Sequence, residues 1–227
     1  MRKFNIPFLF VLFFTVFSVN AGVVIGASRM IYDGNKKEKS ISVENPDAYP
    51  YLMQSWVEDA SGKMIKDNAP FIVTPPLFRL DSKQKNLLRI VKATNALPQD
   101  KETLFWLNIK SIPSKPDTDN NTLQIAVRSR LKLIYRPDAL IGEIPEQYAD
   151  KLVWKKQGTV LTVTNPSNYY INFMTVELNK SKVSEGGFVA PGSSTTFTLP
   201  ANLSSGDLSW KIINDYGGIG AIHHANI

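Results

Sequence analysis

The chain has 227 residues, with 26 Lys and Arg against 20 Asp and Glu, two His and no Cys. Its formal net charge of +6 is mild, and the basic residues are dispersed rather than gathered in the blocks typical of nucleic-acid binding. The lack of cysteine excludes disulfide frameworks, thiol catalysis and Cys-based metal sites, so an exported form must be held together by packed cores.

Residues 1–21 have the pattern of a cleavable secretion signal. A basic head, Arg2-Lys3, precedes the apolar run Phe8–Phe17, and Val19-Asn20-Ala21 offers the small residues that a signal peptidase requires. A transmembrane anchor is the alternative, but the run is shorter than the ~20 residues that span a bilayer. We therefore expect a mature chain that begins at Gly22, carries a net charge of 24 − 20 = +4 and does not insert into a membrane.

Short alternating apolar runs separated by turn residues fill the first part of the mature chain. This rhythm, with almost no helical periodicity, predicts a β-sandwich. The expected strands are Val23–Tyr32, Lys39–Val43, Tyr51–Glu58, Phe71–Thr74, Leu87–Ala93 and Thr103–Ile112.

The most distinctive stretch is Leu123–Pro137, for which the sequence predicts one long strand. Its odd positions are apolar except for Ser129, and its even positions include several Arg and Lys residues. One interpretation is a core strand with a solvated basic face. The other is an exposed apolar edge, which proteins ordinarily avoid because it recruits other strands. Such an edge, if retained, predicts strand capture as its function.

Residues 138–150 lack a strand pattern and are expected to link two domains, with room for one helical turn. The strand rhythm then resumes and predicts a second, smaller sandwich. Its expected strands are Leu152–Lys155, Thr159–Thr164, Tyr169–Leu178, Gly187–Val189, Ser194–Leu199 and Leu208–Ile213. The sequence thus predicts an all-β protein with domains over residues 22–140 and 141–227.

Groups for catalysis are scarce. The only histidines, His223 and His224, lie in the last five residues, where chain termini are usually mobile. No Gly-rich phosphate loop lies between a strand and a helix, and the carboxylates show no recognisable acid–base spacing. We expect no enzyme activity, no metal and no cofactor.

Six segments, in order along nearly the whole mature chain, resemble the PapD-like periplasmic pilus chaperones. The segments are Ser28–Gly34, Ala69–Leu80, Leu97–Pro113, Leu123–Pro137, Thr164–Tyr170 and Ile213–Gly218. The resemblance implies two immunoglobulin-like domains in a boomerang, with a subunit-binding cleft between them. It also implies location in the periplasm and assembly of pili or fimbriae.

The resemblance assigns roles to three sets of residues. Arg29 and Lys132 would grip the C-terminal carboxylate of a pilus subunit, with Arg offering a planar fork and Lys a compact charge. The row Leu123, Ile125 and Val127 would fill the groove left by the subunit's missing strand. The third set, Glu102, Arg136 and Asp215, would form an internal salt-bridge network that fixes the angle between the domains.

The implied partners are pilus subunits, with a tip adhesin among them, and an outer-membrane usher. A second copy of the chain is a further implied partner, which would cover the exposed apolar edge when no client is bound. The short, Cys-free connection from Pro113 to Leu123 resembles the short-loop branch of the family, which assembles rod-like pili. The tail Ile219–Ile227 is short, and the sequence leaves open whether the last strand of the second domain is complete.

Two other classes of function remain open on the residues alone. A secreted adhesive or pilus structural module would need a polymerisable N-terminal extension, for which residues 22–28 are too short. A secreted hydrolase on a β scaffold would need catalytic groups that the sequence does not offer.

Overall fold

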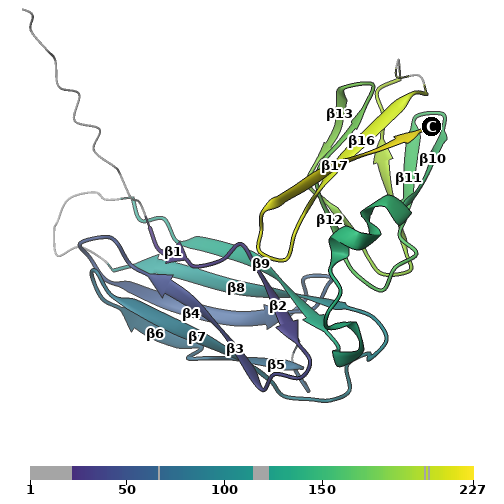
Figure 1. The fold of residues 1–227 in the computed structure, drawn as a ribbon. Coiled ribbons are helices and arrows are strands. Elements are labelled where there is room, and N and C mark those ends of the chain that lie inside the picture. The colour runs from purple at the N-terminus through teal and green to yellow at the C-terminus, as the bar shows by residue number, and fades with distance from the viewer. Residues whose placement is uncertain (1–21, 66, 115–122, 202, 204) are drawn as a thin grey trace, which may run out of the picture.

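The structure, a computed structural model, describes residues 22–65, 67–114, 123–201, 203 and 205–227. It consists of two β-sandwiches set at an angle to each other (Figure 1). This arrangement confirms the predicted all-β fold with two sandwiches in a boomerang. The predicted signal sequence and the centre of the predicted short loop, residues 115–122, lie outside the described residues.

The first sandwich packs a four-stranded sheet, in the order β1-β3-β7-β5, against a five-stranded sheet, in the order β2-β9-β8-β4-β6. Its strands are β1 (Val24–Ile25), β2 (Arg29–Asp33), β3 (Glu38–Glu44), β4 (Tyr51–Glu58), β5 (Phe71–Thr74), β6 (Leu77–Leu80), β7 (Lys85–Lys92), β8 (Thr103–Pro113) and β9 (Val127–Arg136). Alternate residues of the facing strands form its core, among them Leu107, Leu131 and Leu133.

The chain changes from one sheet to the other at two places in the first sandwich, which divides one predicted strand and adds one that was not predicted. The expected strand Val23–Tyr32 is divided into β1, which pairs with β3, and β2, which pairs in parallel with β9. After β5, the Pro75-Pro76 break carries the chain to β6 in the other sheet, where it pairs with β4. A proline lacks the N–H that a ladder needs, which explains the break, but β6 itself was not predicted.

The long strand is shorter than predicted. β9 begins at Val127, so the prediction was wrong for residues 123–126, which are described but lie outside any strand. Over 127–135 the strand is paired with β8, and no described strand pairs with 123–126. Without a ladder partner these residues gain no main-chain hydrogen bonds that would fix a strand.

Two 3₁₀ helices, η1 (Asp138–Leu140) and η2 (Pro145–Lys151), lie in the stretch predicted as a linker and extend one residue beyond it. The second sandwich follows, with sheets in the orders β10-β11-β15 and β13-β12-β16-β17, and β14 pairs with β12. Its strands are β10 (Val153–Gln157), β11 (Val160–Thr164), β12 (Ile171–Leu178), β13 (Ser181–Glu185), β14 (Phe188–Val189), β15 (Ser194–Thr198), β16 (Asp207–Ile213) and β17 (Ile219–Asn226).

The C-terminal tail forms a paired strand, a point that the sequence left open. β17 pairs with β16 from Asp207 to Ile213, with one register irregularity. His223 lies within this strand, where its ring stacks on Trp210 and its Nδ1 is 2.6 Å from Asp150 Oδ1. The tail is therefore part of the second sandwich, and its histidines belong to a paired strand rather than to a mobile end.

Candidate functional site

One edge of β9 is open along half of its length. β8 pairs with β9 from Val127 to Tyr135, whereas β2 pairs with the other edge only from Lys132 to Arg136. Among the described residues, no strand pairs with residues 127–131 on that second edge. Their outward main-chain groups can therefore accept an added strand from another molecule.

The apolar row that leads into this edge is exposed. Leu123, Ile125 and Val127 are 87%, 64% and 51% exposed, although each is a large aliphatic residue. Further along the strand, residues of the same parity enter the core of the first sandwich, beginning with the buried Leu131. The exposed row thus continues the line of core side chains beyond the end of the sandwich.

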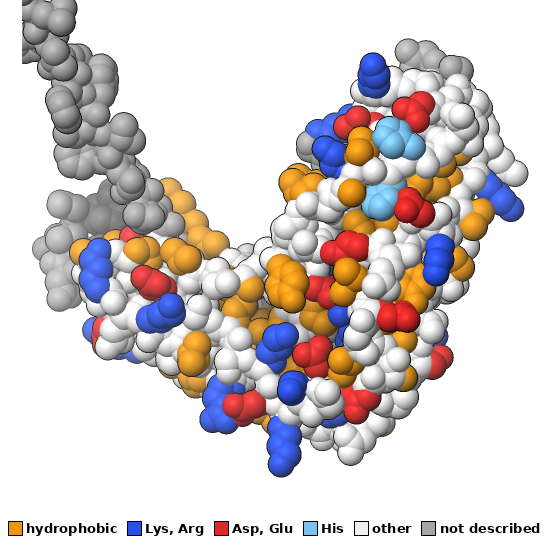
Figure 2. All heavy atoms as spheres, in the orientation of Figure 1, with side chains coloured by type: hydrophobic (Ala, Val, Ile, Leu, Met, Phe, Trp, Pro, Cys, Tyr) orange, Lys and Arg blue, Asp and Glu red, His pale blue; other side chains and the backbone are white. Residues whose placement is uncertain are grey.

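Arg29 and Lys132 are brought together by the parallel pairing of β2 with β9, in which they are direct partners. They lie at the first paired position after the open edge, on the side of the first sandwich that faces the second. Figure 2 shows that the molecule is open on the concave side between its two arms. The two cations are therefore placed where an extended chain along residues 127–131 would end.

The second sandwich contributes to the surroundings of Lys132. Its Nζ donates a hydrogen bond to Asn172 Oδ1 and lies 4.6 Å from the centre of the Phe188 ring. Burial, and then repulsion by Arg29, lower the pKa of Lys132 to about 8. The amine is thus partly dehydrated and has no acidic partner among the described residues, a condition that favours capture of an anion.

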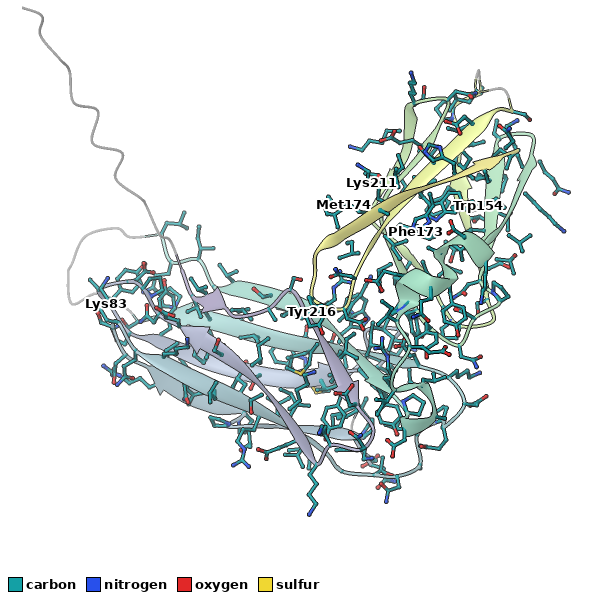
Figure 3. All side chains as sticks on the ribbon, in the orientation of Figure 1. Lys83, Trp154, Phe173, Met174, Lys211 and Tyr216 are labelled. Atoms are coloured by element: carbon teal, nitrogen blue, oxygen red, sulfur yellow. The ribbon has the colours of Figure 1, made fainter. Side chains whose placement is uncertain are left out.

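The guanidinium of Arg29 has hydrogen-bond acceptors for only part of its N–H groups. Its Nη1 donates a long hydrogen bond of 3.5 Å to the Ile213 carbonyl, and its Nε is buried without a hydrogen-bond partner. Burial lowers its pKa, while attraction to Asp215 acts in the opposite direction. Arg29 also lines a groove of about 810 Å³ that extends to Tyr216. Figure 3 shows Tyr216 on the turn between β16 and β17, at the inner corner of the molecule.

The three residues predicted as a network do meet. Arg136 Nε lies 2.7 Å from Glu102 Oε1, and its Nη1 and Nη2 lie 2.7 and 3.0 Å from the carboxylate oxygens of Asp215. The second oxygen of Glu102 accepts a hydrogen bond from the Tyr170 N–H at 2.6 Å. The network therefore joins Arg136 on β9 and Glu102, which directly precedes β8, to two loops of the second sandwich.

In this network burial disfavours the charged forms of Glu102 and Arg136, whereas the hydrogen bonds between them and their neighbours favour those forms. Burial raises the pKa of Glu102 to about 7, against the attraction of Arg136. Burial alone would lower the pKa of Arg136, but its bonds to Asp215 and its attraction to Glu102 raise it. Because both Glu102 oxygens accept hydrogen bonds from N–H groups, the geometry fits the ionised pair.

A set of side chains on the outer face of the same sheet was not predicted from the sequence. Arg128 and Arg130 lie over the rings of Trp56 and Trp106, and both arginines are close to the carboxylate of Glu58. The signal was present, since Trp56 and Glu58 alternate on β4 as the arginines do on β9. What the sequence lacked was the pairing of β4, β8 and β9, which brings the three strands side by side.

The described residues include no group of three or more His, Cys, Asp or Glu side chains that could hold a metal ion. Within the same part of the chain, no helix is long and apolar enough to cross a membrane.

Comparison with known sequences decides the family. The profile of the pili and flagellar-assembly chaperone PapD N-terminal domain matches residues 22–141, and that of the pili assembly chaperone PapD C-terminal domain matches residues 147–224. The chain belongs to the PapD family of pilus chaperones. The two sandwiches are accordingly the immunoglobulin-like domains of that family, as the resemblance implied.

Individual relatives support the same assignment. The chain is 41% identical to the chaperone protein FocC of Escherichia coli over 223 residues, which cover 96% of each chain. It is 46% identical to the chaperone protein FimC of E. coli K12 over 204 residues, covering 88% of this chain and 82% of the relative.

Solved structures of the family have the same fold. The SafB chaperone of Salmonella enterica, solved in complex with the SafA pilin, matches with a TM-score of 0.83 and 35% identity over 92% of this chain and 98% of the other. The periplasmic chaperone SfaE matches with a TM-score of 0.77 and 40% identity over 89% and 98% of the two chains. PapD-family proteins are assembly chaperones rather than enzymes.

Proposed function

We propose that this PapD-family chaperone binds pilus subunits by donating β9 to them as a strand, through its open edge. An added subunit strand would hydrogen-bond to the main chain of residues 127–131, and Leu123, Ile125 and Val127 would fill the groove left by the strand that the subunit lacks. The observation that carries the proposal is the exposure of this apolar row beside an unpaired strand edge.

The anchor gives the added strand its position. Main-chain bonds recur at every second residue, so alone they leave the register of an added strand free. A subunit carboxylate at Arg29 and Lys132 would fix one end of it. At ~4 Å and an effective dielectric near 20, each contact contributes a Coulomb term of roughly 4 kcal/mol before desolvation is subtracted.

The direction of the client strand follows from this placement. With its carboxylate at Lys132 and its body along residues 131 to 127, the client strand runs parallel to β9. The salt bridges among Glu102, Arg136 and Asp215 would hold the two sandwiches at the angle that keeps Arg29 and Lys132 accessible. We assign them a structural role, because a buried network is better suited to fixing geometry than to adding stability.

The cellular cycle follows the family. The chaperone would be exported by residues 1–21, act in the periplasm, cap each subunit against premature polymerisation and deliver it to an outer-membrane usher. Release would occur when another subunit's N-terminal extension displaces β9, so no nucleotide is required. The domain limits 22–140 and 141–227, the short-loop subtype and self-capping as a homodimer stand as part of this proposal.

Co-purification tests the proposal. The mature chaperone would be tagged, expressed in its native periplasm and purified, and the proteins that accompany it identified by mass spectrometry. We expect small immunoglobulin-like pilus subunits with the wild type and their loss with the double variant Arg29→Ala, Lys132→Ala. The variant Lys85→Ala, Arg89→Ala removes two exposed charges from β7 in the other sheet and should retain the subunits. Absence of subunits from the wild type in cells that make pili would refute the proposal.

A further inference from the structure

The outer face of β9 carries three cations at alternate positions, and each lies over an aromatic ring. The guanidinium of Arg128 is 5.0 Å from the centre of the Trp56 ring, that of Arg130 is 4.2 Å from Trp106, and the amine of Lys132 is 4.6 Å from Phe188. Alternate residues of a strand share a face, so the three cations form one row that ends at Lys132.

Glu58, at the end of β4, neutralises the first two cations of this row. Its side chain is 8% exposed; its two oxygens lie 2.7 and 2.8 Å from Arg128 Nη2, and one lies 3.6 Å from Arg130 Nη2. Trp56 Nε1 donates a further hydrogen bond at 3.0 Å. Burial would raise the pKa of Glu58, but the bond from Trp56 and the charges of the arginines lower it. The carboxylate therefore stays ionised at neutral pH.

Lys132, unlike Arg128 and Arg130, is not neutralised by Glu58. Its hydrogen-bond acceptor is the neutral amide of Asn172, so its charge remains available to a client anion. Arg128 and Arg130 are 45% and 39% exposed, and they would offer competing positions for the same anion if Glu58 did not balance their charge.

The competing position matters because of the period of a β-strand. A client strand that slips by two residues, about 7 Å, keeps every apolar side chain on its original face. The apolar row of the client does not resist such a slip, and the slip brings its C-terminal carboxylate from Lys132 to Arg130.

We infer that Glu58 is a specificity-determining residue that keeps the client carboxylate at Arg29 and Lys132 and away from Arg128 and Arg130. It acts in two ways, by balancing the charge of the two arginines and by repelling a second carboxylate placed beside them. The inference rests on the proposed function, because it concerns the register of the same client strand.

The absence of cysteine from the chain makes the register measurable. Single cysteines would be introduced as Val127→Cys or Ser129→Cys, two positions that share the inner parity of β9. The probe is a synthetic peptide with the sequence of a pilus subunit's last strand, a free carboxylate and one cysteine on the inward face that lies opposite residue 129 when the carboxylate is at Lys132. The disulfide yield at each position reports the register. The yields at the two positions are calibrated with a second peptide in which the cysteine is moved by two residues.

With Glu58 intact, we expect bonding mainly at position 129. In Glu58→Gln, which keeps an acceptor for Trp56 but loses the charge, the ratio of bonding at 127 to that at 129 should rise about fivefold, the change expected from one ion pair of ordinary strength. Glu58→Asp should preserve the wild-type ratio. So should Glu38→Gln, which removes an exposed carboxylate paired with Arg89 on the opposite sheet. The double variant Glu58→Gln, Arg130→Gln should return to the wild-type ratio, because the competing cation is gone.

A variant with Glu58 intact tests the same inference if Glu58→Gln does not fold. In Lys132→Gln the anchor is lost, but Arg130 remains balanced, so the peptide should bind weakly and without preference for position 127. A shift to 127 in this variant, or an unchanged ratio in folded Glu58→Gln, would overturn the role of Glu58. An amidated peptide that the wild type bonds as strongly at 129 as the free acid would instead count against the carboxylate anchor of the proposed function.

Discussion

Arg29 and Lys132 are direct partners in the parallel ladder between β2 and β9, and this pair is the first on that edge. The open edge of β9 therefore ends at these two residues, and their side chains place two cations at that end. β2 blocks any added strand from extending past Lys132, so steric exclusion and charge act at one point. In this geometry the position at which β2 begins sets the length of the open edge of β9.

The pKa of Lys132 predicts a pH dependence of client binding. Burial and Arg29 lower it to about 8, whereas a C-terminal carboxylate is ionised above about pH 4. Only the protonated amine attracts that carboxylate, so affinity should be highest between these values and fall as the pH rises through 8. Binding of a fluorescent subunit peptide, measured from pH 6 to pH 10, checks this.

The matched control replaces the titrating group. Lys132→Arg keeps a cation with a pKa far above this range, so its affinity should stay nearly level up to pH 10. An amidated peptide should bind weakly at every pH. A fall in affinity of the same size in Lys132→Arg would show that another group causes it.

The exposed apolar row predicts variants that lose client binding without losing stability. Ile125 is 64% exposed and lies outside any strand, so Ile125→Asp should change the free energy of unfolding by less than about 0.5 kcal/mol. In the complex the new carboxylate would enter an apolar groove, so subunit capture should be lost. Denaturant unfolding and periplasmic co-purification measure the two effects.

A control for this variant places the same charge on another exposed aliphatic residue. Val153, on β10 of the second sandwich, is 47% exposed, and Val153→Asp should leave capture intact. Capture of subunits by Ile125→Asp at the wild-type level would remove the apolar row from the mechanism.

The buried network predicts a large loss of stability when one partner is removed. Arg136 is 6% exposed and balances both Glu102 and Asp215, so Arg136→Met should leave two acids uncompensated and lower the free energy of unfolding by about 3–5 kcal/mol. Small-angle scattering should show a wider range of angles between the sandwiches. Arg79→Met breaks an exposed pair with Asp81 and should cost about 0–1 kcal/mol without changing the scattering.

The residues that the sequence identified correctly are those marked by local pattern. Tyr51–Glu58 and Phe71–Thr74 were predicted with the bounds of β4 and β5, because period-two alternation and flanking turn residues define both ends. The residues assigned through the family resemblance, Glu102, Arg136 and Asp215, also meet in the structure. The carboxylate-binding roles of Arg29 and Lys132 stay predictions until a client is bound.

Features that depend on long-range pairing were not visible in the sequence. Whether residues 123–126 form a strand depends on a partner strand, and their alternating pattern cannot report its absence. The role of Glu58 depends on β4 lying two strands away from β9 in the sheet. The order of strands is a property of the fold, so the alternation of Trp56 and Glu58 on β4 could not indicate that they lie beside the arginines of β9.

Phe173 and Met174 are adjacent on β12, but their truncation should destabilise the second sandwich to very different extents. Figure 3 labels both residues, together with Trp154, on this sandwich. Phe173 is fully buried, and its ring lies 5.7 Å from Trp154 and 5.9 Å from Phe197, whereas Met174 is 39% exposed. Phe173→Ala should therefore leave a cavity and lower the free energy of unfolding by about 3–5 kcal/mol. Met174→Ala should cost less than about 1 kcal/mol, because most of its surroundings are solvent.

The unfolding of the two sandwiches must be followed separately for this comparison. Phe173 lies in the buried cluster of the second sandwich with Trp154 and Trp210, so amide exchange of residues 152–227 reports on the packing around it. We expect Phe173→Ala to accelerate exchange in that range while residues 29–113 keep their protection. Equal acceleration in both sandwiches would mean that they unfold as one unit, with the Glu102, Arg136 and Asp215 network transmitting the loss from one to the other.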